Sequence, residues 1–142
     1  MIYIIITSLI FSVSDGIREG SRLQWHYDEL HNNFISADQH NRAWHKWQFI
    51  SNVSAVSLGF TIALDSYNED KINWINVCFK TFLSGAIFYN VRDIAMNITR
   101  NREPFAAATH NYSGLKQFDF LKIPLLILSI TINYLYDQDI IF

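Results

Sequence analysis

The sequence is poor in cysteine, proline and glycine, and it carries no large excess of charge of either sign. Its 142 residues include one Cys, two Pro and five Gly, and the formal net charge is −2. The single cysteine, Cys78, excludes an internal disulfide. The scarcity of Pro and Gly argues against long low-complexity linkers, and the charge gives no sign of a partner nucleic acid. We therefore expect one domain over residues 1–142.

The motifs of several enzyme classes are also missing. There is no Gly-rich phosphate loop, no Gly-x-Ser-x-Gly and no Cys-x-x-Cys. His26 and His31, like His40 and His45, are five positions apart. Zinc-binding helices place two His four positions apart, on one face. The sequence therefore indicates no metal and no cofactor, and it assigns no catalytic residue.

What the chain does contain is apolar sequence gathered into four stretches. Half of the residues are hydrophobic, and they concentrate at residues 1–14, 47–64, 72–91 and 120–136. A helix needs about 20 mainly apolar residues to cross the hydrocarbon core of a bilayer. We predict an all-α polytopic membrane protein, with four transmembrane helices in a small bundle. The predicted spans are about 2–20, 44–64, 72–97 and 118–136.

The charged residues predict how the spans are oriented. The polar connectors 21–43 and 98–117, with the adjoining helix ends, hold all but two of the 11 Lys and Arg. The connector between the second and third spans is acidic instead. The positive-inside rule then places the two basic connectors in the cytoplasm and both termini on the non-cytoplasmic side. We expect a multi-pass protein of the inner (cytoplasmic) membrane.

Two alternatives stay open for the apolar stretches. The first stretch could be a cleaved signal peptide, although no basic region precedes it, so we expect it to remain uncleaved. The chain could also be a small soluble helical bundle, because apolar runs of 14 to 18 residues occur in core helices as well.

Polar residues recur at helical spacing at the inner ends of three predicted spans. In the first span, for example, Ser8, Ser12 and Asp15 fall on one stripe. Helix interfaces in lipid favour small and hydrogen-bonding residues, so we expect these stripes to face inward and to form one polar chamber. The inner-chamber candidates are Asp15, Glu19, His45, Gln48, Asn90, Asp93 and Asn97.

This chamber has two interpretations. In one it is an interhelical network, in which Asp15 pairs with Arg18, and Asp93 with Arg92 or Arg100. In the other it is a binding site, with carboxylates and His around a divalent cation. Arginines would then bind an anion or a lipid headgroup. The anion candidates are Arg18, Arg22, Arg92 and Arg100.

Lys80 is the intramembrane charge of the third predicted span: it is the one charged residue of the apolar stretch 72–91, about 12 Å from its outer end. Such a lysine is uncommon and points to function by default. We expect it instead to extend along its stem to the outer surface, or to pair with Asn73 and Asn76.

Three segments carry a resemblance to a group of known sequences. They are SDGIREG (14–20), WHKWQ (44–48) and YNVRDIAMNITRNREPF (89–105). In their order they resemble uncharacterised small integral membrane proteins of bacteriophages and Bacteroidota. The segment AAATHNYSG (106–114) departs from the aromatic and Gly-rich run expected there. The resemblance implies a membrane setting, without a mechanism.

Three functions are compatible with the sequence. The first is a non-enzymatic inner-membrane protein of phage or bacterial origin that acts through the lipid bilayer, a membrane-protein partner or a homo-oligomer. The second is a metal-assisted membrane-embedded hydrolase with a cytoplasm-facing polar site, using Asp15, Glu19, His45 and Asp93. The third is a small transporter or holin-like permeabiliser with Lys80 in its conducting path.

Overall fold

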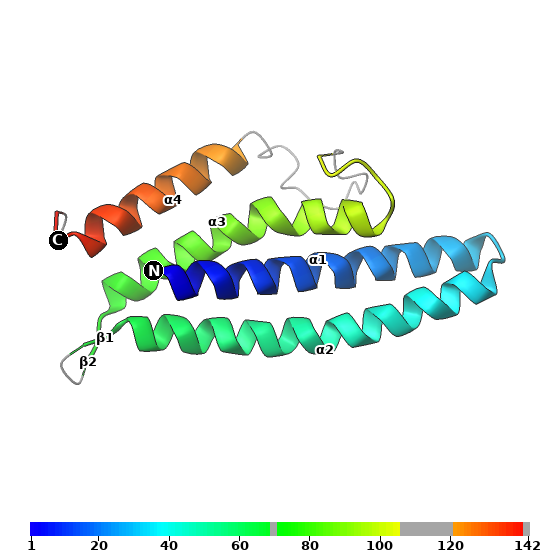
Figure 1. The fold of residues 1–142 in the computed structure, drawn as a ribbon, viewed down its shortest axis with the longest axis horizontal. Coiled ribbons are helices and arrows are strands. Elements are labelled where there is room, and N and C mark those ends of the chain that lie inside the picture. The colour runs from blue at the N-terminus through cyan, green and yellow to red at the C-terminus, as the bar shows by residue number, and fades with distance from the viewer. Residues whose placement is uncertain (69–70, 106–120, 141–142) are drawn as a thin grey trace.

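A computed structural model describes residues 1–68, 71–105 and 121–140. These residues form four helices, and the predicted all-α, four-helix architecture is confirmed (Figure 1). Each helix coincides with one apolar stretch; residues 118–120 of the fourth predicted span lie outside the described residues. The helices are α1 (Ile2–Leu30), α2 (Phe34–Asp65), α3 (Trp74–Thr99) and α4 (Lys122–Asp137).

The first two helices are longer than the predicted spans. They have 29 and 32 residues and run through most of the polar connector 21–43, leaving only residues 31–33 as a turn. Asn32 in this turn has φ 58°, a left-handed conformation that asparagine tolerates better than most residues. The connector is therefore a helical hairpin tip, which projects past the end of α3 (Figure 1).

The opposite end of the molecule holds both termini and a short ribbon. Strands β1 (Tyr67–Asn68) and β2 (Lys71–Ile72) pair antiparallel, with Tyr67 opposite Ile72. Asn73 then caps α3 by accepting a hydrogen bond from the backbone N–H of Asn76 at 3.1 Å. Figure 1 places the N-terminus, the C-terminal end of α4 and this ribbon at the same end, as expected for four helices that alternate in direction.

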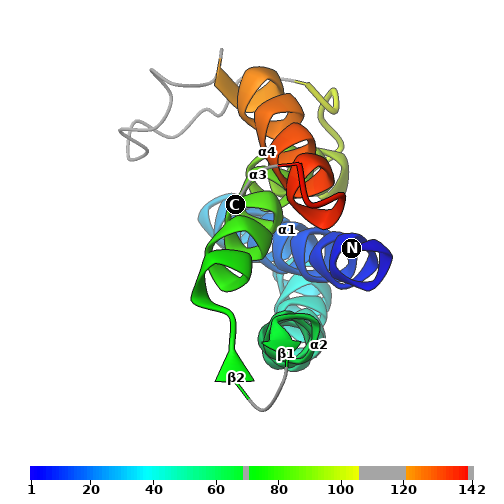
Figure 2. The same cartoon turned by 90° about the vertical axis from the view of Figure 1, so that its left-hand side faces the viewer.

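The helices form a row rather than a closed square. α1 lies centrally and packs against α2 on one side and α3 on the other, and α4 packs on α3 (Figure 2). The apolar core is correspondingly small. Ile4, Leu58 and Ile62 are its buried members, and Phe11 and Val77 pack against them.

The distribution of side chains is inverted relative to a water-soluble protein. The fully buried side chains are mostly polar, whereas large apolar side chains cover the surface. In soluble proteins Lys is almost never fully buried and buried polar groups are the exception. Among the described residues, the largest fully buried side chains are Lys80, Ile4, Leu83, Asn97, Asn133, Ser8, Ser12, Ser14, Ser21, Ser51, Ser66 and Ser129.

Candidate functional site

The inner ends of the helices meet at a cluster of ion pairs. Arg92 of α3 donates from Nε to Oδ2 of Asp15 on α1 at 2.7 Å, and its Nη1 lies 3.5 Å from Oδ1 of Asp93. Lys122, the first residue of α4, donates from Nζ to Asp93 at 2.8 Å. Ser51 of α2 donates to Asp15 at 3.2 Å. The two carboxylates thus share one guanidinium, and the cluster joins all four helices.

Arg18, Arg22 and Glu19 form local ion pairs within α1. Arg18 lies 2.9 Å from Asp15, as the three-residue spacing predicts, and Arg22 donates from Nε to Glu19 at 3.0 Å. Together with Arg92, these arginines are engaged by carboxylates. An anion or headgroup would have to compete with those carboxylates for the same donors.

Two amide candidates tie backbone segments together. Asn90 donates to the backbone carbonyl of Lys122 at 3.0 Å, which anchors the start of α4 on α3. Asn97 is buried and donates to the carbonyl of Pro104 at 3.1 Å, which holds the chain after α3 against that helix. Both side chains therefore hold backbone segments of this protein in place.

The structure does not bring His45 into this cluster. His45 is exposed and lies against the ring of Trp44, and Gln48 is only half-buried. The buried face of α2 is formed instead by Ser51 and Ser54, together with the apolar core residues. Successive side chains along a helix are rotated by about 100°. The predicted polar stripe of α2 therefore lies on the face next to the buried one, and it points outward.

Arg100 is the fourth predicted anion candidate and lies just after α3. Burial, and to a lesser degree the positive charge of Arg102, lowers the pKa of the Arg100 guanidinium. No ion pair of Arg100 with a carboxylate occurs among the described residues. Arg100 therefore differs from the three paired arginines in its electrostatic setting.

The chemistry available at the cluster follows from these pairings. Each of its carboxylates faces at least one cation, so the geometry matches the interhelical network. Over residues 1–68, 71–105 and 121–140, no group of three or more His, Cys, Asp or Glu is placed to hold a metal ion. The described geometry assembles neither the proposed hydrolase residues nor a cation site.

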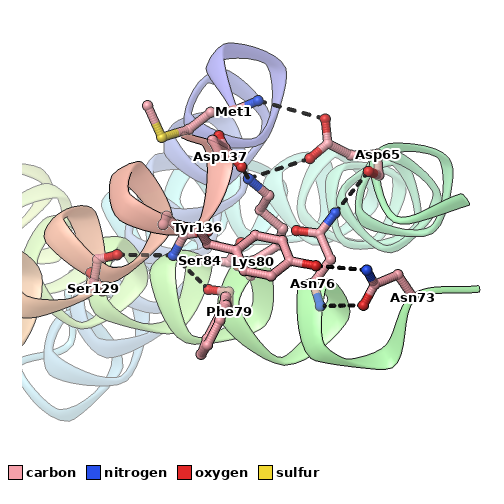
Figure 3. A network of polar contacts seen from close by, with 11 residues as sticks. Met1, Asp65, Asn73, Asn76, Phe79, Lys80, Ser84, Ser129, Tyr136 and Asp137 are labelled. Atoms are coloured by element: carbon pink, nitrogen blue, oxygen red, sulfur yellow. Dashed lines mark hydrogen bonds and ion pairs between the residues drawn. The ribbon is translucent and has the colours of Figure 1, made fainter. Parts of the chain in front are cut away.

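A second ionic cluster lies at the outer end, around Lys80 (Figure 3). Lys80 is 1% exposed, and its Nζ lies 2.6 Å from Oδ1 of Asp137 on α4 and 3.6 Å from Oδ2 of Asp65 on α2. The amine of Met1 lies 3.5 Å from Asp65. This cluster, like the inner one, joins all four helices.

The expected local partners of Lys80 have other roles. Asn73 donates to the hydroxyl of Tyr136 at 2.6 Å, and Asn76 donates to the backbone carbonyl of Asp65 at 2.9 Å (Figure 3). Lys80 therefore neither extends to the surface nor pairs with these amides. Its partners are carboxylates from other helices, since a buried ammonium needs a compensating negative charge.

A close approach of α1 and α3 at two glycines was not predicted from the sequence. A Cβ at Gly16 would lie 2.4 Å from the backbone oxygen of Arg92, and one at Gly20 would lie 2.8 Å from Cβ of Thr99. These glycines let the backbones of α1 and α3 approach closely. The signal was present as Gly-Ile-Arg-Glu-Gly, a G-x-x-x-G spacing of the kind that mediates close helix packing in membranes.

A buried carboxylate in the hairpin tip was also missed. Asp28 of α1 is 4% exposed; it accepts from Ser36 at 2.7 Å and from Gln24 at 3.2 Å, and lies 2.9 Å from Nδ1 of His40. Burial raises the pKa of Asp28, but the hydrogen bonds from these neighbours outweigh it and hold the pKa below its usual value. This group links α1 to α2 beyond the end of α3.

The comparisons with known proteins identify no relative. No family model, no curated protein and no solved structure matches this chain. The resemblance to small membrane proteins of bacteriophages and Bacteroidota therefore stays a prediction.

One described helix meets the length and composition of a membrane span. That helix is α2, and only 17% of its apolar stretch is buried within the protein. Two other kinds of helix meet the same test. One is the core helix of a soluble protein, which is mostly buried, and the other is a signal sequence, which lies near the N-terminus. By this test alone the protein has one candidate span within the described residues.

Proposed function

We propose that this protein is a multi-pass integral membrane protein in which all four helices cross the bilayer. It acts through contacts of its exposed apolar surface with lipids or a partner protein, and it has no assigned catalytic activity. The inner (cytoplasmic) membrane, in a phage or bacterial setting, is the proposed location.

The inverted distribution of side chains carries this proposal. Serines and asparagines are buried between the helices, while large apolar side chains of α2 such as Val56 (75% exposed), Phe49 (71%) and Phe60 (65%) face outward. In water this arrangement would expose apolar surface without compensation. In lipid it is favourable, because buried polar groups find partners between helices and apolar groups contact acyl chains.

The positions of the charges support the same proposal. Residues 2–14, 52–64, 81–91 and 123–136 contain no Asp, Glu, Lys or Arg. These segments lie between the inner cluster around Arg92 and the outer cluster around Lys80, one segment on each helix. A charge-free belt on four adjacent helices is expected for a membrane domain.

Sidedness follows from the belt and the basic residues. The hairpin tip, the chain after α3 and the helix ends that adjoin them carry all but two of the 11 Lys and Arg, and the termini lie at the opposite end. The positive-inside rule puts the hairpin tip in the cytoplasm and the termini outside.

The two other candidate functions gain less support. The hydrolase needs His45 beside Asp15 and Asp93, but His45 is exposed on α2. The transporter needs Lys80 to line a path, but its ammonium is held by two carboxylates in the outer cluster. Liposome leakage measured with purified protein tests the transporter separately.

Membrane fractionation tests the proposal itself. An integral protein stays in the membrane pellet at alkaline pH and requires detergent for release. Recovery of folded protein in the soluble fraction without detergent would contradict it.

A further inference from the structure

Resting on the proposed membrane location, we propose that this protein fits a bilayer thinner than the usual one. Its preferred hydrocarbon core is about 20 Å thick, whereas a typical core is about 30 Å thick. The partner is thus a lipid bilayer of short acyl chains, or a bilayer that the protein thins around itself.

The two ionic clusters set this thickness. From the start of α1 at Ile2 to Asp15, and from Lys80 to Arg92 along α3, the chain advances 13 and 12 residues. At 1.5 Å per residue both distances are about 20 Å. On α4, Lys122 and Asp137 bound a similar length. The two clusters are thus about 18–23 Å apart along each of these three helices.

The exposed apolar surface has a matching height. Between the two ionic clusters, the large exposed apolar side chains extend from Ile2 to Val13 on α1 and from Ile123 to Tyr134 on α4; further exposed apolar side chains, such as Leu30 and Ile35, lie beyond the inner cluster in the hairpin tip. Each interval is about 17 Å along the helix. On α2 the interval from Phe49 to Leu64 is longer, at about 23 Å. The surface offered to lipid is thus shorter than a typical hydrocarbon core on all three helices.

The charges that bound this surface cannot easily lie in hydrocarbon. Although Lys80 is buried, the side chains of its partners Asp65 and Asp137 are 29% and 31% exposed. At the inner end the side chains of Arg18 and Arg92 are 28% and 27% exposed. A thicker core would cover these partly exposed charges with acyl chains, which is costly. A span shorter than the hydrocarbon core is usually accommodated by thinning of the bilayer, by extension of flanking side chains or by oligomerisation, whereas tilting of the helices would shorten the span further.

Reconstitution into bilayers of different thickness tests the inference. The full chain is placed in vesicles of monounsaturated phosphatidylcholine with acyl chains of about 14, 18 and 22 carbons. The inserted fraction and the midpoint of thermal unfolding are measured in each. We expect the highest midpoint with the shortest chains, and a fall of about 5 °C or more towards the longest.

The outcomes separate this inference from the proposed function. Insertion in every lipid with the highest stability at 18 or 22 carbons would overturn the inference and leave the membrane proposal standing. Failure to insert at any thickness would overturn both. Gly59→Ala is the matched control, because a Cβ there meets nothing within 4 Å. The acyl-chain length that gives the highest unfolding midpoint should be the same for Gly59→Ala as for the unchanged chain. A different optimal chain length would indicate that the spacing of the ionic clusters does not determine it.

Discussion

Replacement of Gly16 by alanine is the sharpest test of the helix packing. The added Cβ would lie 2.4 Å from the backbone oxygen of Arg92 and 2.7 Å from Cβ of Ala95. Because the first of these contacts is with backbone, α1 and α3 must move apart to relieve it. The same movement lengthens the hydrogen bond between Arg92 and Asp15, which is now 2.7 Å.

The expected magnitude combines two opposing effects. Overpacking of a tight interface costs about 1–3 kcal/mol. Alanine favours the helix over glycine by up to about 1 kcal/mol, which offsets part of this cost. Gly16→Ala should therefore lower the free energy of unfolding by about 1–2 kcal/mol.

Gly59→Ala supplies the control for this prediction. Nothing lies within 4 Å of a Cβ at Gly59, so only the helix preference remains, and the variant should be neutral or slightly more stable. The assay is unfolding in detergent micelles followed by circular dichroism, with both variants measured side by side. Equal stability of Gly16→Ala and Gly59→Ala would refute the close approach of α1 and α3.

Three further predictions concern the buried charges. Lys80→Met should destabilise the protein because it leaves the Asp137 carboxylate without its cation, and Lys80→Met combined with Asp137→Leu should recover part of the lost stability. Chemical denaturation measures the stability of both variants. No recovery in the double variant would argue against the ion pair. In a double-mutant cycle, Asp15→Asn and Arg92→Gln should be clearly non-additive, whereas simple additivity would contradict their ion pair. Because the pKa of Asp28 is held below the usual value of an aspartate, the ionised carboxylate stabilises the hairpin tip above the ordinary aspartate pKa, and this stabilisation is lost as the pH falls through the lowered pKa. The protection of amides in the turn, taken relative to their intrinsic exchange rates at each pH, should fall in acid for the unchanged chain but not for Asp28→Asn, and an equal fall in the two would contradict this.

The four helices could be predicted because apolar stretches and helices coincide in this chain. Their ends could not be predicted equally well. Helix α1 continues through the polar residues after Gly20 to Leu30. These residues favour a helix and pack against α2, although they are not apolar. The helix stops only before Asn32, where the backbone turns left-handed.

The candidate site was predictable where its contacts are local or periodic. Asp15 and Asp93 lie on stripes that do face inward, and the pair of Asp15 with Arg18 follows from their spacing. The partner of Lys80 was not predictable, because Asp137 lies 57 residues away in the sequence. Pairing at that distance depends on how α4 packs on α3, which helical periodicity alone does not specify.

His45 illustrates a different limit. Its spacing from Gln48 suggested an inward stripe on α2, but Ser51 and Ser54 occupy the buried face. Polar residues were present on two neighbouring faces of this helix, and the sequence alone did not distinguish them. The contact with α1 decides which face is buried.

Accessibility of single cysteines tests the four-span account most directly. In a chain with Cys78→Ala, a cysteine is placed either at exposed Asn68 in the ribbon or at Leu30 in the hairpin tip, which is 81% exposed. Intact cells are treated with a membrane-impermeant thiol reagent. The account predicts labelling of Asn68→Cys in intact cells and of Leu30→Cys only after permeabilisation. Labelling of both positions in intact cells, or of Leu30→Cys alone, would contradict the proposed topology.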